Sequence, residues 1–208
     1  MIVIGITGSI GMGKSTAAEM LRDLGIPVHD SDATIHWFLA AKGKGVAAVG
    51  EKFPEALKTN ADGDQYIDRH ILGKIVFADR HRKKELEDIL HPLVWAESQR
   101  FIDEMKQKGH EIVALDIPLL FETGGEKRVD VTLCVSAPKE IQKERVLARP
   151  GMTSEKFDKI VAGQMSDAEK RKQADYVIET GKDFEDVRKQ LTVVVEKIRV
   201  EKIRPPKM

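Results

Sequence analysis

The sequence predicts an α/β protein in which five parallel strands form a doubly wound sheet. Three observations support this class. Short apolar runs lack the alternation of a half-exposed strand, which is typical of strands buried on both faces. Stretches with apolar residues at helical spacing separate these runs. The first run also leads directly into a glycine-rich segment and a helix-compatible segment. A chain of 208 residues suits one large domain, or a core that carries an inserted lobe.

Strands and helices are expected to alternate along most of the chain. The five strands are predicted at residues 2–7, 27–29, 112–116, 131–136 and 176–178. The accompanying helices are predicted at 16–24, 138–148 and 183–200, where apolar residues recur on one face. Gly25 is expected to stop the first helix, and Ser136 is a candidate N-cap of the second. Residues 201–208 contain two adjacent prolines and are predicted to be a frayed tail.

Residues Gly8 to Ser15 fit the phosphate-binding loop pattern G-x-x-x-x-G-K-[ST]. A strand, this loop and a helix follow one another in the order that binding requires. Backbone N–H groups of the loop can surround phosphate oxygens, and the helix N-terminus points its positive end at the same anion. The residues expected to bind ATP are Gly8, Gly11, Met12, Gly13, Lys14, Ser15 and Thr16. Lys14 would reach the β- and γ-phosphates, and the Ser15 hydroxyl would ligate Mg²⁺.

About eighty residues after the second strand show no good strand pattern. Apolar residues there repeat at helical spacing, and His91 before Pro92 is expected to end one helix and begin another. We therefore expect residues 31–110 to form a helical lobe inserted into a nucleotide-binding core of residues 1–30 and 111–200. Such a lobe suits a second substrate, and a purely structural extension is the alternative. A helical lid is expected at about 139–170 within the core.

Composition excludes several classes of protein. Lys plus Arg (34) equals Asp plus Glu (34), which disfavours bulk binding to nucleic acid or membrane surfaces. The single cysteine, Cys134, excludes an intrachain disulfide and a cysteine-rich zinc site, and it is expected to be a buried structural thiol. No basic leader precedes the first strand, and no apolar run approaches the ~20 residues of a membrane span. We expect a cytoplasmic protein without membrane or nucleic-acid partners and without an evident obligate protein partner.

Asp30-Ser31-Asp32 follows the second strand, at the sheet edge where ligands gather in this architecture. Asp32 is the candidate general base, since a carboxylate can accept a hydroxyl proton as the new bond forms. The alternative is that one of these residues only caps the following helix. For Asp30 a capping role and a site role stay equally open, and one residue can have both.

Two further sets of residues suit phosphoryl transfer. Asp116 ends an apolar strand, a position from which a carboxylate can hold Mg²⁺ directly or through water. We therefore expect Asp116 to be a metal ligand. Arg145 and Arg149 stand four apart near a Pro-Gly break, so they share one helix face and suit a lid that closes over triphosphate. The alternative is that these arginines lie on a solvated helix face. The basic run at residues 80–84 is also expected to lie on a solvated face.

Together these segments resemble the dephospho-coenzyme A kinase family over nearly the whole chain. The matching segments are Ile4 to Thr16; Leu24-Gly25 leading to Asp30-Ser31-Asp32; Asp68-Arg69 before Ile75-Val76-Phe77; Leu86 to Pro92; Pro118-Leu119-Leu120-Phe121-Glu122; Gln142, Arg145 and Arg149; Gln164; and Ala174-Asp175 before Val177-Ile178. The phosphate loop is generic. The His-Pro and Pro-Leu-Leu-Phe-Glu segments are more specific.

The resemblance implies transfer of the γ-phosphoryl of ATP to the ribose 3′-hydroxyl of dephospho-coenzyme A. It implies that Asp32 is the base, that Lys14, Arg145 and Arg149 assist catalysis, and that the inserted lobe binds the acceptor. The implied substrate-binding residues are Asp30, Asp32, Arg69, His91, Pro118 and Leu119, and the implied metal ligands are Ser15 and Asp116. A structural role for His91 stays open.

The chain departs from the family pattern at four places. The family often has glycine at the position of Ser9, serine or alanine at that of Met12, and alanine at that of Ser31, and these positions are expected to tolerate different side chains. Glu179-Thr180-Gly181 replaces an Asn-x-Gly segment, so contacts to the adenine are expected to differ. Two alternative functions stay open: another small-metabolite kinase, acting on a nucleoside monophosphate or a sugar acid, and a regulatory ATPase. The sequence contains no Asn-Lys-x-Asp segment, the pattern that recognises guanine, and this argues against the regulatory alternative.

Overall fold

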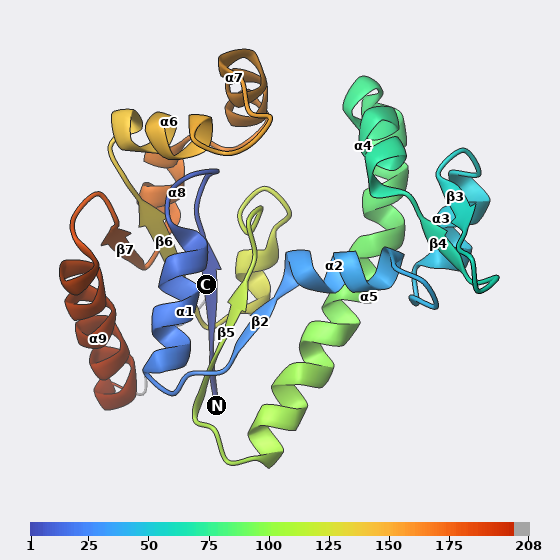
Figure 1. The fold of residues 1–208 in the computed structure, drawn as a ribbon. Helices are drawn as coiled ribbons and strands as arrows, with labels where there is room; N and C mark the ends of the chain where they lie inside the picture. The colour runs from blue at the N-terminus through green and yellow to red at the C-terminus, as the bar shows by residue number, and fades with distance from the viewer. Residues whose placement is uncertain (202–208) are drawn as a thin grey trace. The chain divides into compact units, whose positions relative to one another are not determined.

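The central sheet has five strands in the order β2-β5-β1-β6-β7 (Figure 1). The computed structural model describes residues 1–201. The strands are β1 Ile2–Thr7, β2 Val28–Asp30, β5 Ile112–Asp116, β6 Val131–Ser136 and β7 Tyr176–Glu179. The central strand, β1, pairs in parallel with β5 and β6, and β6 pairs in parallel with β7. Every residue of β5 and β6 is buried, which explains their unbroken apolar runs.

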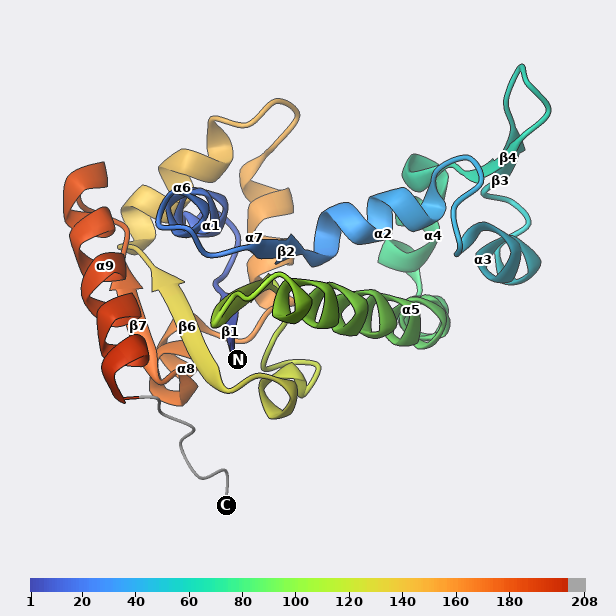
Figure 2. The same cartoon turned by 90° about the horizontal axis from the view of Figure 1, so that it is seen from below.

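Helices cover this sheet and complete its core. The helices of this unit are α1 Lys14–Asp23, α6 Lys139–Leu147, α7 Ser154–Ala162, α8 Asp167–Gln173 and α9 Phe184–Glu201, with a 3-10 helix at Gly125–Arg128. Figures 1 and 2 show α1 and α9 side by side. Their apolar faces join one core cluster with β1 and β6, in which Ile4, Leu21, Leu133 and Leu191 are fully buried. The predicted alternation of strand and helix is confirmed, with shifts of one or two residues at several ends.

The chain divides into two compact units. One contains Met1–His29 and the chain from Glu104 onward, and the other is Asp30–Asp103. The second unit contains α2 Ser31–Leu39, α3 Val46–Lys52, β3 Leu57–Thr59, β4 Gln65–Ile67, α4 Arg69–Ala78 and most of α5 Arg80–Gln107. It has a hydrophobic cluster of its own, in which Val49, Phe53 and Ala56 are completely buried. A separate core is what an independently folded lobe requires.

The expectation that residues 31–110 lack strands is wrong in one place. β3 and β4 form an antiparallel pair in which Leu57 faces Ile67. The turn between them begins at Asn60, whose side-chain oxygen accepts hydrogen bonds from the N–H groups of Asp62 and Asp64. Each strand is only three residues long, too short for alternation to stand out in the sequence.

The expected helix boundary at His91 is also wrong. α5 runs from Arg80 to Gln107 with Pro92 inside it. A proline removes one backbone donor and disfavours helical geometry in the preceding residue. Burial of Leu90 and Val94 on either side of the proline gives the helix a packed face that offsets this cost. Packing therefore overrides the local preference for a break.

Ser136 is not the N-cap of α6. It is the last residue of β6, and its hydroxyl donates to Asp167 Oδ2 at 2.8 Å and accepts from Arg171 Nη1 at 2.9 Å. The N-cap position of α6 is occupied by Pro138, which makes no side-chain cap.

In the predicted tail, residue 201 ends α9, and residues 202–208 lie outside the described part of the chain. Among the described helices, none has the length and apolar content needed to cross a membrane.

Candidate active site

The glycine-rich loop connects β1 to α1, as its sequence predicts (Figure 1). Gly11 and Gly13 have φ angles of +77° and +86°, in the left-handed region where a Cβ is strained. Space is also restricted at both positions. A Cβ on Gly11 would lie 2.5 Å from Val146 Cγ2, and one on Gly13 would lie 3.0 Å from Thr180 Oγ1. The backbone conformation therefore favours glycine at both positions, and close packing adds to this requirement at Gly11.

The N-terminus of α1 follows this loop and is suited to an anion. Its first turn contains no acidic side chain, and its N-cap, Gly13, makes no side-chain hydrogen bond. The first N–H groups of a helix lack partners within the helix and carry its partial positive charge. Lys14, Ser15 and Thr16 belong to this turn, and Ser15 is exposed. The arrangement can receive phosphate oxygens.

Lys14 and Asp116 lie together. The Lys14 ammonium forms an ion pair and a hydrogen bond with Asp116 Oδ1. Asp116 is the last residue of β5 and is only 4% exposed. β5 pairs with β1, and β1 leads into the loop that ends at Lys14. This contact brings the predicted phosphate-binding lysine next to the predicted metal ligand.

Three side chains hold the backbone of the loop in contacts that the sequence did not predict. The Thr180 hydroxyl donates to the carbonyl of Met12 at 2.6 Å. Gln142 Nε2 donates to the carbonyl of Ile10 at 2.8 Å, and the N–H of Ile10 donates to Gln164 Oε1 at 3.1 Å. These three partners come from segments more than 120 residues away in sequence. The two glutamines occur in the family-like motifs, but no local pattern revealed what they contact.

The two predicted lid arginines differ in their surroundings. Arg145 Nη2 donates to the carbonyl of Thr180 at 2.7 Å, and its Nη1 lies 3.3 Å from Thr180 Oγ1. Arg145 is thus connected through Thr180 to the carbonyl of Met12 in the phosphate loop. Arg149 is exposed just beyond α6. The structure joins Arg145 to the loop and leaves Arg149 at the surface.

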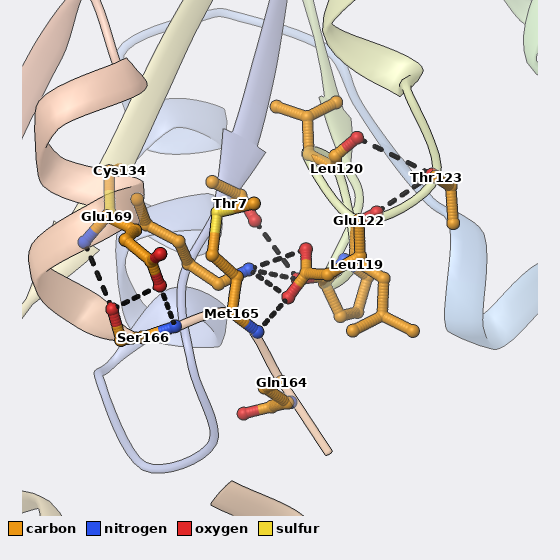
Figure 3. Close-up of polar contacts among 12 residues, drawn as sticks. Thr7, Leu119, Leu120, Glu122, Thr123, Cys134, Gln164, Met165, Ser166 and Glu169 are labelled. Carbon is orange, nitrogen blue, oxygen red and sulfur yellow. Dashed lines mark hydrogen bonds and ion pairs between the residues drawn. The ribbon is translucent and has the colours of Figure 1, made fainter. Parts of the chain in front are cut away.

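The segment after β5 is held by a buried lysine. The Pro118 carbonyl accepts hydrogen bonds from Thr7 Oγ1 at 3.0 Å and Lys170 Nζ at 3.3 Å. Figure 3 shows Thr7 and Glu122 in this network. The Leu119 carbonyl accepts from Thr123 Oγ1 at 2.8 Å. The backbone carbonyls of Pro118 and Leu119, both predicted to contact the acceptor, therefore have internal partners.

In the second unit, Asp30 is the N-cap of α2. Its Oδ1 accepts a hydrogen bond from the N–H of Ala33 at 2.9 Å, so the capping alternative for Asp30 describes a real contact. Asp32 is exposed in the first turn of the same helix. Arg69 is the first residue of α4 and is exposed, whereas His91 is half-buried within α5. Asp32, Arg69 and His91 thus come from three helices, and Asp30 stands directly before the first of them.

Comparison with known proteins identifies the family. The dephospho-CoA kinase family model matches residues 2–186. A dephospho-CoA kinase of Rhodopseudomonas palustris strain HaA2 is 45% identical over 196 residues, which cover 94% of this chain and 95% of that protein. The chain belongs to the dephospho-CoA kinase family. It is therefore an enzyme of the kinase class.

Solved structures agree with this membership. A crystal structure of a protein from Thermus thermophilus has a TM-score of 0.78 at 38% identity, covering 95% of this chain and 97% of that one. A dephospho-CoA kinase from Campylobacter jejuni has a TM-score of 0.70 at 27% identity, covering 97% and 98% of the two chains. The dephospho-CoA kinase fold thus extends over nearly the whole chain, including the glycine-rich loop.

Two residues that differ from the common family pattern are more constrained than the sequence suggested. Met12 is 2% exposed, belongs to the main core cluster, and its sulfur lies 3.1 Å from the N–H of Ala137. Ser9 is 6% exposed. The expectation that these side chains vary freely is inconsistent with their burial. In this dephospho-CoA kinase family member, the Met12 side chain packs in the core, so only its backbone remains for a nucleotide.

Proposed function

We propose that this chain transfers the γ-phosphoryl group of ATP to the ribose 3′-hydroxyl of dephospho-coenzyme A. The reaction is the ATP-dependent phosphorylation of dephospho-coenzyme A, the last step of coenzyme A biosynthesis. The observation that carries the assignment of the donor site is the contact between Lys14 and Asp116 beside a glycine-rich loop. That arrangement provides a phosphate cradle, a cation and a carboxylate in one place.

The donor half consists of the loop and α1. Backbone N–H groups of the loop and of the first turn of α1, other than those of Ile10 and Met12, bind the phosphates of ATP, and Lys14 turns from Asp116 to the β- and γ-phosphates. Since the reaction needs little covalent participation by the protein, these groups act by positioning the phosphates and stabilising their charge. Arg145 and Arg149 are proposed to lie at the triphosphate when the lid, residues 139–170, closes. Closure would also exclude water, which would otherwise hydrolyse ATP.

The donor set fits Mg²⁺. Ser15 offers an exposed hydroxyl at the start of α1, and Asp116 offers a carboxylate that pairs with the neighbouring residue, Lys14. In the described part of the chain, no group of three His, Cys, Asp or Glu side chains is placed to hold a metal. Mg²⁺ is commonly bound by one or two protein oxygens together with phosphates and water, which matches this sparse set. When bound, Mg²⁺ neutralises charge on the phosphate oxygens.

The acceptor half is the inserted lobe of residues 31–110. Its own hydrophobic cluster supports a separate role in substrate binding. Asp32, exposed in the first turn of α2, is proposed to orient the acceptor hydroxyl and take its proton. Asp30, Arg69, His91, Pro118 and Leu119 are proposed to bind the acceptor. A cytoplasmic location is proposed as well, because the one cysteine is buried and free.

Acceptor dependence tests the proposal. ADP release would be measured with Mg-ATP and dephospho-coenzyme A, AMP, gluconate, or no acceptor. We expect dephospho-coenzyme A alone to stimulate release strongly, and the product to carry a new phosphate on the 3′-oxygen by ³¹P NMR. Stimulation by AMP or gluconate, but not by dephospho-coenzyme A, would assign the chain to another small-metabolite kinase. Equal release without any acceptor would instead indicate an ATPase.

A further inference from the structure

Ile10, within the glycine-rich loop, has both of its backbone polar groups bonded to glutamine side chains. Its carbonyl accepts from Gln142 Nε2 at 2.8 Å, and its N–H donates to Gln164 Oε1 at 3.1 Å. A backbone carbonyl can only accept and a backbone N–H can only donate a hydrogen bond. The side-chain amides of the two glutamines must therefore be oriented in opposite ways. Gln142 must present its nitrogen, and Gln164 must present its oxygen.

The two glutamines stand at opposite ends of one segment. Gln142 lies in α6, and Gln164 follows α7, so residues 143–163 are attached at both ends to a single loop residue. We call residues 143–163 the α7 segment. Gln142 is 5% exposed, so its amide is fixed within the protein interior. A shift of the Ile10 backbone would therefore disturb both ends of the α7 segment together.

An ion pair between Glu122 and the buried Lys170 secures the end at Gln164. The N–H of Met165, the next residue, donates to Glu122 Oε1 at 2.9 Å, and Figure 3 shows these residues facing each other. Glu122 pairs with Lys170 Nζ at 2.8 Å, and Lys170 is completely buried. Lys170 and Thr7 both donate to the carbonyl of Pro118. Since Thr7 ends β1 directly before the loop, the contacts lead from the loop to Gln164 and back to β1.

We propose that Gln142 and Gln164 are positioning residues that couple the phosphate-binding loop to the α7 segment through the backbone of Ile10. The proposal rests on the proposed binding of ATP at this loop. ATP phosphates that order the loop would fix Ile10, and Ile10 would then restrain both ends of the α7 segment. In return, the two amides hold the loop in the conformation that binds phosphate. Neither glutamine is proposed to touch the reacting atoms.

The same substitution at the two positions separates this role from a general packing role. Gln164→Glu keeps an oxygen for the N–H of Ile10 and is expected to behave like wild type. Gln142→Glu removes the donor and places carboxylate oxygen against a carbonyl. Gln142→Met and Gln164→Met remove each hydrogen bond at similar volume. For Gln142→Glu, Gln142→Met and Gln164→Met, we expect KM for ATP to rise roughly five- to tenfold, the scale of one lost hydrogen bond. KM for dephospho-coenzyme A is expected to change less than twofold.

Trypsin provides a readout that packing alone would not alter. Lys156 and Lys159 are exposed on α7. Saturating adenylyl-imidodiphosphate is expected to slow cleavage there in wild type, in Gln164→Glu, and in the controls Gln107→Met and Gln107→Glu at an exposed residue ending α5. Gln142→Met and Gln164→Met should lose this protection although nucleotide saturates them. Melting temperatures and cleavage without nucleotide show whether each variant is folded.

Two outcomes would overturn the proposal. One is wild-type nucleotide protection and wild-type KM for ATP in folded Gln142→Met and Gln164→Met. The other is equal damage from Gln164→Glu and Gln164→Met, because the acceptor oxygen would then be irrelevant. Gln142→Met substitutes for Gln142→Glu if the buried charge of the latter prevents folding. The trypsin experiment needs no acceptor, so its result stays separate from a failure of dephospho-coenzyme A to be phosphorylated.

Discussion

Lys14 and Asp116 form an ion pair where α1 begins and β5 ends. Asp116 is nearly buried, and removing the lysine partner from a buried carboxylate lowers the stability of the folded protein. The same two residues are proposed to bind ATP phosphates and Mg²⁺. The pair thus stabilises the nucleotide-free site with the charges that the substrate would later engage.

Lys14→Met is therefore expected to affect both stability and activity. Turnover should fall about 10²–10³-fold with dephospho-coenzyme A, the scale for losing one positioned charge-stabilising group. The unfolding free energy should fall by about 1–3 kcal/mol because a carboxylate is left without this partner. Lys14→Met/Asp116→Asn should recover most of the lost stability and none of the activity. Urea unfolding and ADP release measure the two effects, and a double variant as unstable as the single one would contradict the argument.

Asp32→Asn tests the proposed base. Asparagine keeps the size of the side chain but cannot accept the hydroxyl proton, so turnover is expected to fall roughly 10²–10⁴-fold. ATP affinity, measured by calorimetry, should stay within about twofold because ATP is assigned to the other unit. The matched control is Asp62→Asn, an exposed aspartate in the turn between β3 and β4. Turnover by Asp32→Asn equal to that of the control would leave Asp32 as a residue of the α2 first turn only.

The sheet was predictable because its signals are local. Buried strands give unbroken apolar runs, and three of the five, at 2–7, 112–116 and 131–136, match their predicted bounds. The β3–β4 pair was missed because three-residue strands carry little pattern. The helix break at Pro92 was wrong because burial of Leu90 and Val94 outweighs a local backbone preference. Elements that depend on tertiary packing are the ones that sequence pattern places least well.

The candidate site divides in the same way. The loop, Lys14 and Asp116 follow from residue type and spacing, and the structure places them together. The contacts of Gln142, Gln164 and Thr180 with the loop could not be foreseen, since each joins residues far apart in sequence. Met12 was misjudged for a related reason. The loop motif describes backbone binding, whereas the core defines the space for its side chain.

Thr180 is expected to support the loop through its hydroxyl. This hydroxyl donates to the carbonyl of Met12 at 2.6 Å in a buried environment. Thr180→Val keeps the shape but removes the donor, leaving that carbonyl without this hydrogen bond. We expect KM for ATP to rise roughly three- to tenfold, corresponding to about 1 kcal/mol. Thr180→Ser should keep the donor and a KM near wild type, and steady-state kinetics with varied ATP compare the two. A folded Thr180→Val variant with a wild-type KM for ATP would contradict this role of the hydroxyl.

Glu97 is expected to stabilise the inserted lobe in a pH-dependent way. A hydrogen bond from Arg100, followed by one from Lys44, lowers the pKa of the Glu97 carboxyl below its ordinary 4.5. The stabilisation is therefore present above about pH 4.5 and is lost as the pH falls through the lower folded-state pKa. Glu97→Gln should cost about 1–2 kcal/mol at pH 7 and less at pH 3.5.

Urea unfolding at the two pH values measures this difference. Glu55→Gln is the control, because the Glu55 carboxylate is exposed and lies 3.7 Å from Arg82. Exposed pairs contribute little, so this control should change stability by less than about 1 kcal/mol at either pH. A cost for Glu97→Gln that stays constant between pH 7 and pH 3.5 would show that ionisation of Glu97 does not contribute.

Cys134 provides a thiol that should react only when the core opens. It is completely buried in β6, and burial raises the pKa of its thiol to about 12. Because the thiolate is the reactive form, the native protein at pH 8 should react with Ellman's reagent at least about 10²-fold more slowly than the urea-unfolded protein. ATP should slow the native reaction further if binding stabilises the core.

The raised pKa of the Cys134 thiol also predicts that the stability of the protein falls above about pH 9, where the unfolded thiol ionises while the folded one keeps its proton. Cys134→Ala, which cannot react, should lack this thiol-dependent alkaline loss. Rapid labelling of the native protein would show instead that β6 opens readily.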